Sequence, residues 1–222
     1  VGRFALTANT TGTQNTAVGS LALDACTTAN HNSAFGYNTL SNSTTGQQNT
    51  ALGSQAIVGC TTGSFNTGAG YGALSQTTTA SHNTAVGNLA LAVNTTGQRN
   101  TAVGSLALDA TTTGSFNTAV GYTSLGANTT GALNAALGDA ALASNTTGDF
   151  NVSVGQASMG TNSTGSNNTA CGYQALNANT TASNNTAVGK SALAANTTGH
   201  SNVAVGSIAL DANTTGERNT SI

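Results

Sequence analysis

The strict period of the sequence is the feature that most limits its fold. The pentapeptide NTAVG at Asn15 returns unchanged at Asn83, Asn100, Asn117 and Asn185, and related segments fill the intervals. With Asn15 as position 1, every later copy begins 17 residues after the one before, without insertion or deletion. The consensus is N-T-A-V-G-x-x-A-L-x-x-N-T-T-G-x-x. A strict period gives each copy an equivalent place in space, so residues 1–222 are expected to form a single uninterrupted repeat array.

The length of the unit selects the architecture. Seventeen residues are too few for two packed helices, and the unit lacks a 3.6-residue apolar pattern. Gly at position 5 of every copy would destabilise a helix by roughly 1 kcal/mol each time. The unit instead suits one coil built from two or three short strands joined by tight turns. The sequence therefore predicts an all-β fold, a parallel β-solenoid (β-roll or β-helix) of about 13 coils.

Stacked coils would place equal repeat positions in columns about 4.7–4.9 Å apart. Position 9 is Leu in almost every copy and position 4 is apolar in nearly all, so both are expected to be core columns. Position 1 is always Asn, and stacked Asn amides can form hydrogen-bonded ladders. Gly at position 5 is expected where the backbone needs positive φ or a close approach. The T-T-G segment at positions 13 to 15 is expected to form a second corner.

Charged and aromatic residues indicate the outer surface. All ten charged residues fall at positions 6, 10, 16 and 17. All four Tyr occupy position 6, and Phe65, Phe116 and Phe150 occupy position 17. These four positions are therefore expected to face solvent.

Two further columns suggest contact with another subunit. Adjacent strand residues point to opposite faces, and an ordinary solenoid strand has one buried and one wet face. Positions 3 and 4 are both restricted, to Ala and to larger apolar residues, and positions 8 and 9 repeat this pattern. We therefore expect one face to line the coil and the small residues at positions 3 and 8 to pack against another subunit. The alternative is a monomeric solenoid with an Ala-rich outer face.

Composition excludes several classes of function. The net charge of −2, from 4 basic and 6 acidic residues, provides no basic surface for nucleic acid and no polybasic segment for an anionic membrane. No apolar run approaches the 18 residues of a membrane-spanning helix. Disordered chains usually carry high net charge and much Pro, and this chain has neither. We expect no nucleic-acid partner and no membrane insertion.

The repeats resemble two families of fibrous proteins. NTAVG followed by small residues and a Gly turn is similar to the N-S-x-A-hydrophobic-G repeats in the heads of trimeric autotransporter adhesins. It is still more similar to the NTA(V/I)G…NTTG arrays of phage tail-fibre-like proteins, over the whole of 1–222. The adhesin resemblance implies a left-handed parallel β-roll, a homotrimer displayed outside the cell, and binding to surfaces or matrix. The adhesin repeat is shorter than the present one, and neither family implies a catalytic residue.

Residues able to carry out chemistry are sparse. His31, His82 and His200 lie on widely separated copies without a recurring carboxylate, whereas a metal site needs converging, oriented ligands. No Ser, His and Asp come together as a catalytic triad requires. We therefore expect no enzyme activity, no catalytic or metal-binding residue and no cofactor.

The three Cys predict no disulfide framework. Cys171 replaces Val at position 4 and is expected in the core. Cys26 and Cys60 share position 12 but lie two coils apart, so stacking would separate their Cα atoms by roughly 9–10 Å, beyond the ~7 Å limit for a disulfide. A bond between subunits at one level remains an alternative.

Seven N-T-T triplets match the acceptor pattern for N-glycosylation. The alternative, which we favour, is that Asn and Thr cap the backbone of a tight turn. In a glycosylating host the candidate acceptors would form one stripe: Asn9, Asn94, Asn128, Asn145, Asn179, Asn196 and Asn213.

The Thr columns raise an ice-binding solenoid as a less favoured alternative. Such faces present two outward ranks of Thr, whereas the Thr residues at positions 13 and 14 are adjacent and should point in opposite directions.

The function that fits this pattern is mechanical. Val1 and Ile222 both fall at position 4 of ordinary copies, whereas solenoids normally end in atypical capping coils. We expect a segment of a longer chain that serves as a stiff extracellular fibre or adhesin shaft, on a cell surface, a virion or a secreted filament. The expected partners are further copies of itself and, through aromatic residues at positions 6 and 17, surface glycans or matrix. The alternative is an extracellular filament subunit that stacks end to end.

Overall fold

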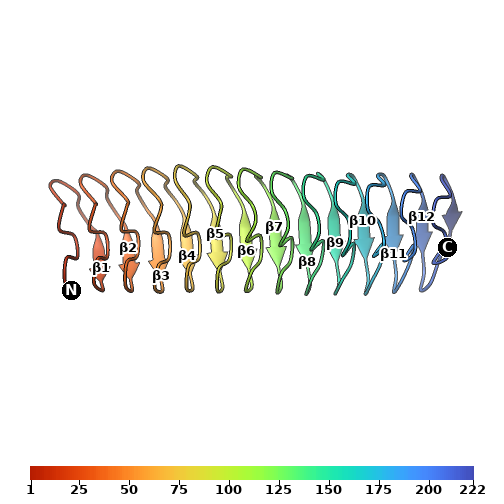
Figure 1. Cartoon of the computed structure of the whole chain (residues 1–222), viewed down its shortest axis with the longest axis horizontal. Coiled ribbons are helices and arrows are strands. Elements are labelled where there is room, and N and C mark those ends of the chain that lie inside the picture. The colour runs from red at the N-terminus through yellow and green to blue at the C-terminus, as the bar shows by residue number, and fades with distance from the viewer. The chain divides into compact units, whose positions relative to one another are not determined.

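The structure, a computed structural model, describes all 222 residues as two compact units, Val1–Gly114 and Ser115–Ile222. Each unit repeats one short strand and a run of turns every 17 residues, and neither contains a helix (Figure 1). Unit 1 contains β1 (Thr16–Val18), β2 (Ser33–Phe35), β3 (Thr50–Leu52), β4 (Thr67–Ala69), β5 (Thr84–Val86) and β6 (Thr101–Val103). Unit 2 contains β7 (Thr118–Val120), β8 (Ala135–Leu137), β9 (Val152–Val154), β10 (Thr169–Cys171), β11 (Thr186–Val188), β12 (Val203–Val205) and β13 (Thr220–Ser221).

Strands within each unit pair in parallel with the next strand along the chain. In unit 1, Thr16 is opposite Ser33 and Ala17 is opposite Ala34, and the same offset continues from β2 to β6. In unit 2 the offset holds from β7 to β13. Equal repeat positions therefore lie side by side, and the predicted all-β parallel solenoid is confirmed in each unit.

Each coil contains one strand rather than two or three. The φ angle is positive at positions 7, 9 and 17 of every copy, as at Leu21 (60°), Leu23 (52°) and His31 (59°). Residues with such angles interrupt an extended strand. The turns still bond to the neighbouring coil, since the Leu23 N–H donates to the Thr39 carbonyl at 3.0 Å. The turn segments therefore stack in the same register as the strands.

Gly at position 5 has both of the predicted roles. From Gly19 to Gly206, φ at this position lies between 122° and 141°, a region that is essentially restricted to Gly. A Cβ atom added to Gly36 would lie 2.8 Å from the carbonyl carbon of Gly53 in the next coil. Both the backbone angle and the close approach of coils thus require Gly.

The apolar interior is built from positions 3, 8 and 9. The position-9 side chains from Leu23 to Leu193, including Ile57 and Met159, are fully buried, which confirms this column. Full burial of such a side chain contributes roughly 1.5–3 kcal/mol. Ala residues at positions 3 and 8 fill the remaining space.

The prediction that position 4 is a core column is wrong. Val18, Phe35 and Leu52 are 42, 40 and 54 % exposed, because strand alternation turns position 3 inward and position 4 outward. The interior beside the strand has room only for a small side chain. Gly68 is the one Gly at position 3 of a strand, and a Cβ added to it would lie 2.7 Å from Cγ1 of Ile57.

The same finding corrects the predicted subunit contact. Positions 3 and 8 were expected to pack against another subunit, but their Ala side chains line the inside of the coil. The outward-facing column is the one with larger apolar residues. Small size at these positions reflects a narrow interior and not a close approach of subunits.

Asn at position 1 forms the predicted ladder inside the coil. The Oδ1 atom of Asn32 accepts the backbone N–H of Asn49 at 2.9 Å, and its Nδ2 donates to the Gly46 carbonyl at 2.9 Å. Asn32 and Asn49 are fully buried. Each amide therefore joins the start of one strand to the next coil and also holds the T-T-G corner of its own copy.

Replacing Gly138 by Ala should unfold part of unit 2. The added Cβ would lie 2.7 Å from the Gly155 carbonyl carbon, at a φ of 137°, so strain of about 1–3 kcal/mol adds to the clash. Gly160→Ala is the matched control, because Ala already occupies the equivalent position at Ala143 and an added Cβ would lie within 3 Å only of the end of the Asn177 side chain, which can move. Urea unfolding followed by circular dichroism should show a large loss of stability for Gly138→Ala alone. Equal stability of the two variants would contradict this account of position 5.

Candidate functional site

The outer face of the strands is a regular surface in each unit. Position 2 is mostly Thr, position 4 is mostly Val or Leu, and both point outward from every full strand. Apart from Val1 and Ile222 in the terminal copies, the exposed large apolar side chains at position 4 are 37 to 54 % exposed in the two units. No charged residue occurs at either position. This surface is here called the strand face, and it consists of positions 2 and 4 of each copy.

The strand face could have been found from the sequence by a different argument. Side chains along the T-A-V triplet point alternately to the two faces of the strand, so either Ala or both Thr and Val must point inward. The adjacent Leu at position 9 already fills the interior, which leaves space for Ala only. If the more hydrophobic residue is assumed to point inward, Val at position 4 is chosen instead of Ala at position 3, and this choice is wrong.

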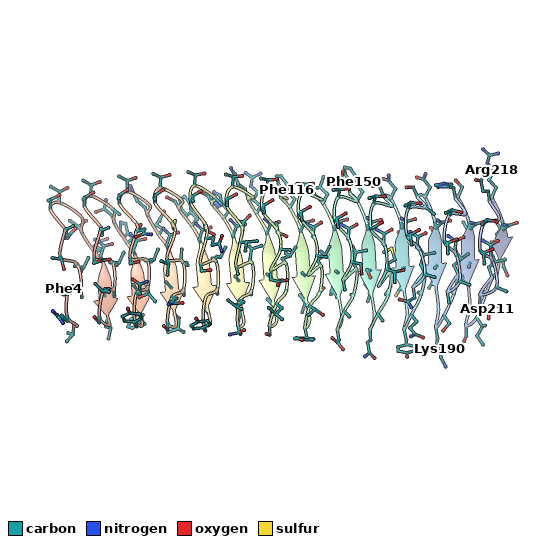
Figure 2. The ribbon with its side chains drawn as sticks, viewed as in Figure 1. Phe4, Phe116, Phe150, Lys190, Asp211 and Arg218 are labelled. Carbon is teal, nitrogen blue, oxygen red and sulfur yellow. The ribbon has the colours of Figure 1, made fainter.

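In unit 2 the strand face is bordered by additional apolar side chains. Phe116, Leu133 and Phe150 at position 17 are 47, 47 and 55 % exposed. Figure 2 shows Phe116 and Phe150 along one edge of the unit and Lys190, at position 6, at the opposite edge. Position 2 also changes here from Thr to Ala135 and Val152. Three consecutive copies thus carry an apolar patch that reaches from one edge onto the strand face.

Aromatic residues at positions 6 and 17 are exposed, as predicted. Tyr37 and Tyr71 are about half exposed in unit 1. The rings of Phe65 and His82, one copy apart at position 17, stack with centroids 4.7 Å apart and planes 5° from parallel. Side chains at these edges therefore align from coil to coil. Position 10 is mostly half-buried and less open than predicted.

The candidate glycosylation residues form a second amide ladder. Asn145 Nδ2 donates to Asn128 Oδ1 at 2.9 Å and to the Gly148 carbonyl at 3.0 Å. The side chains of Asn94, Asn128, Asn145, Asn179 and Asn196 are fully buried, whereas Asn9 is exposed and Asn213 half-buried in the terminal copies. Within the folded array the buried amides cap the turn and are not presented to solvent.

The two Thr columns differ in their surroundings. Position 13 is half-buried over most of the chain, and the Thr27 hydroxyl donates to the Thr44 carbonyl of the next coil at 3.1 Å. Position 14 is Thr and exposed in every copy. The adjacent side chains thus have different environments, and position 14 alone forms a fully exposed rank of Thr.

The three thiols occupy two environments, and none forms a disulfide. Cys26 and Cys60 are buried at position 12, and burial raises the pKa of Cys60 to about 11 and that of Cys26 above its ordinary value. Cys171 is exposed on the strand face, so the prediction that it lies in the core is wrong for the same reason as position 4 in general. Only Cys171 is therefore accessible as a thiol.

Position 16 contains a ladder that the sequence did not reveal. In several copies its side chain accepts the backbone N–H of the same position in the preceding copy. Examples are Ser64 with Gln47, Asp149 with Ala132 and His200 with Ser183, at 3.0, 2.7 and 3.0 Å. The side chains that take part share only the capacity to accept a hydrogen bond, and Ala132 lacks it, so the column looks variable in sequence.

Titratable groups do not gather into a site. His31, His82 and His200 lie apart, and no group of three His, Cys, Asp or Glu side chains converges. Burial raises the pKa of Asp109 at position 10. No pocket interrupts the surface. None of the chain forms a helix with the length and apolarity that a membrane crossing needs.

Comparison with known proteins gives no relative: no protein family, curated protein or solved structure matches the chain.

Replacing Asn151 by Asp should make stability depend on pH. Asn151 Nδ2 donates to the Gly165 carbonyl at 2.9 Å and its Oδ1 accepts the Asn168 N–H at 3.0 Å. A buried carboxyl there would have a pKa above its unfolded value of about 3.9. The folded state would then bind more protons, so the free energy of unfolding should fall as pH rises from about 4 to 7.

The control is Asn167→Asp, the same change at an exposed residue, measured by urea unfolding at several pH values. Its stability should follow that of the wild type, whose pH dependence is small because the chain has few ionisable groups. A pH-independent Asn151→Asp variant would contradict the burial of this ladder.

Replacing Thr77 by Asn should stabilise unit 1 by about 1 kcal/mol. Thr77 Oγ1 and Asn94 Oδ1 are buried without a hydrogen-bond partner, because position 12 of unit 1 is not a continuous run of Asn. An Asn at 77 would donate to the Ala80 carbonyl and accept from Asn94 Nδ2, as Asn179 does with Ala182 and Asn196. Thr79→Asn, at the exposed position 14, is the control and should change the urea midpoint little. A gain in both variants would point to a general effect of Asn.

Proposed function

We propose that this chain is a non-catalytic structural array, a segment of a stiff extracellular fibre or adhesin shaft on a cell surface, a virion or a secreted filament. The observation that carries the proposal is the continuity of hydrogen bonding from coil to coil. Strands, turns and the position-1 column of buried Asn amides all bond in the same register within each unit, and unit 2 adds the second Asn column at position 12. Such a structure resists bending because any bend must break several of these ladders together.

The proposal includes self-association, with a homotrimer as the expected assembly. The exposed apolar column on the strand face supports it, because a regular apolar surface on every coil is unusual for a monomer. The resemblance to trimeric adhesin heads is a separate argument from the repeat sequence. Aromatic side chains at the edges, such as Tyr37 and Tyr71, support contact with surface glycans or matrix.

Solution scattering tests stiffness and assembly together. Light scattering coupled to size exclusion should give a finite trimer of the 222-residue chain. Small-angle X-ray scattering of the same fractions should show the inverse first-power decay of a rigid rod. Decay typical of two units joined by a flexible link would contradict the shaft.

Negative-stain images separate the alternatives. Particles of one length are expected for a shaft segment, whereas open-ended growth from this chain alone would favour the end-to-end filament. Inhibition of ice recrystallisation at micromolar protein would favour the ice-binding alternative instead. A monomer at every concentration would contradict self-association while leaving the stiffness measurement valid.

A further inference from the structure

We propose that a second copy of this chain docks on the strand face, with the position-4 side chains of one copy packing between those of the other. This inference rests on the self-association in the proposed function and assigns it a surface. It replaces the expected contact through positions 3 and 8, which are interior.

The chemistry of the strand face favours an apolar partner. Val120, Leu137, Val188 and Val205 in unit 2 are each 37 to 42 % exposed, and each is the last residue of its strand. Charges are confined to positions 6, 10, 16 and 17, so positions 2 and 4 carry none. When two such faces meet, their exposed apolar area is removed from water. This burial contributes a favourable free energy of roughly 25 cal/mol per Å².

The shape of the strand face favours a partner with the same repeat. A three-residue strand is on the order of 10 Å long, so each coil offers a narrow strip. A standard interface takes about 800 Å² from each partner, which a short or globular contact with this strip cannot supply. A partner must therefore follow the strip over many coils, with side chains spaced by about 4.7–4.9 Å. A second copy of the chain has that spacing.

The apolar patch of unit 2 indicates where the contact is strongest. Phe116, Leu133 and Phe150 widen the strand face over three consecutive copies, and Val152 adds apolar area at position 2. Each Å² of apolar surface that is removed from water contributes roughly 25 cal/mol to association. The widened region would give the two copies a preferred alignment that an unbroken repeat does not provide.

Cys171 is a natural reporter of this contact. It lies on the strand face at position 4 of β10 and is exposed, directly beside Val188 in the register of β10 and β11. Cys26 and Cys60 are buried inside the coil. A thiol reagent applied to the folded chain therefore measures the accessibility of the strand face through Cys171, while the other two thiols report loss of folding in unit 1.

The test compares maleimide labelling and light scattering for the wild-type chain and two variants, above and below the assembly concentration. Val188→Asp places a charge on the strand face. Asn88→Asp places the same charge at exposed position 6, away from the strand face. In the assembled wild type and in Asn88→Asp, labelling of Cys171 should be at least roughly tenfold slower than in Val188→Asp, because a covered thiol is shielded from the reagent. Val188→Asp should be a monomer with the circular dichroism spectrum of the wild type and with Cys26 and Cys60 unlabelled.

The outcomes separate this inference from the proposed function. An oligomer in which Cys171 reacts at the rate of an exposed thiol, and which Val188→Asp leaves intact, would overturn docking on the strand face but keep self-association. A wild-type monomer at all concentrations would overturn both. If Val188→Asp exposes Cys26 and Cys60, the variant is unfolded. Val120→Asp, on β7, then takes its place, and persistence of its oligomer would likewise reject the strand face.

Discussion

The fold depends on how the interior satisfies the backbone polar groups that its turns leave unpaired. Each coil turns at position 5 and at the positive-φ residues of positions 7, 9 and 17, and every turn interrupts a regular strand ladder. Buried N–H and C=O groups must nevertheless find partners. The Asn at position 1 supplies both kinds, since Oδ1 accepts an N–H of the next coil and Nδ2 donates to a carbonyl of its own copy. An interior made only of Leu and Ala could not provide these bonds, so the amide ladder is what allows such a short coil to close.

The sequence predicted the parts of the fold that depend on one residue type. Asn at position 1, Gly at position 5 and Leu at position 9 each have a single physical reason to recur, and the structure places all three as expected. Positions 3 and 4 were assigned to the wrong sides, and Cys171 with them. Apolar residues occur at both positions, and only the space beside Ile57 and its Leu equivalents decides which one fits inside. That space forms only when the coil closes, so no single segment of the sequence reveals it.

Columns in which different residues share the same hydrogen-bonding role were harder to predict. Position 16 contains Ser, Asn, Asp and His, which share an acceptor atom directed at the preceding copy. Position 12 is a run of Asn in unit 2, but in unit 1 it includes Cys26, Ser43, Cys60 and Thr77. The ladder therefore continues in one unit and is interrupted in the other, although the backbone is the same. Variation along a column can thus indicate either an exposed position or a buried one with an adaptable partner.

The constant 17-residue offset also affects how such a chain can change length. Almost every backbone bond between coils joins equal or neighbouring positions of adjacent copies, so the backbone of a coil in the middle of a unit meets the same ladder whichever copies flank it. Loss or gain of one whole copy leaves the ladders in register, whereas loss of a single residue displaces every column that follows. The number of coils is therefore a quantity that selection can adjust in whole steps, without passing through sequences that fail to fold.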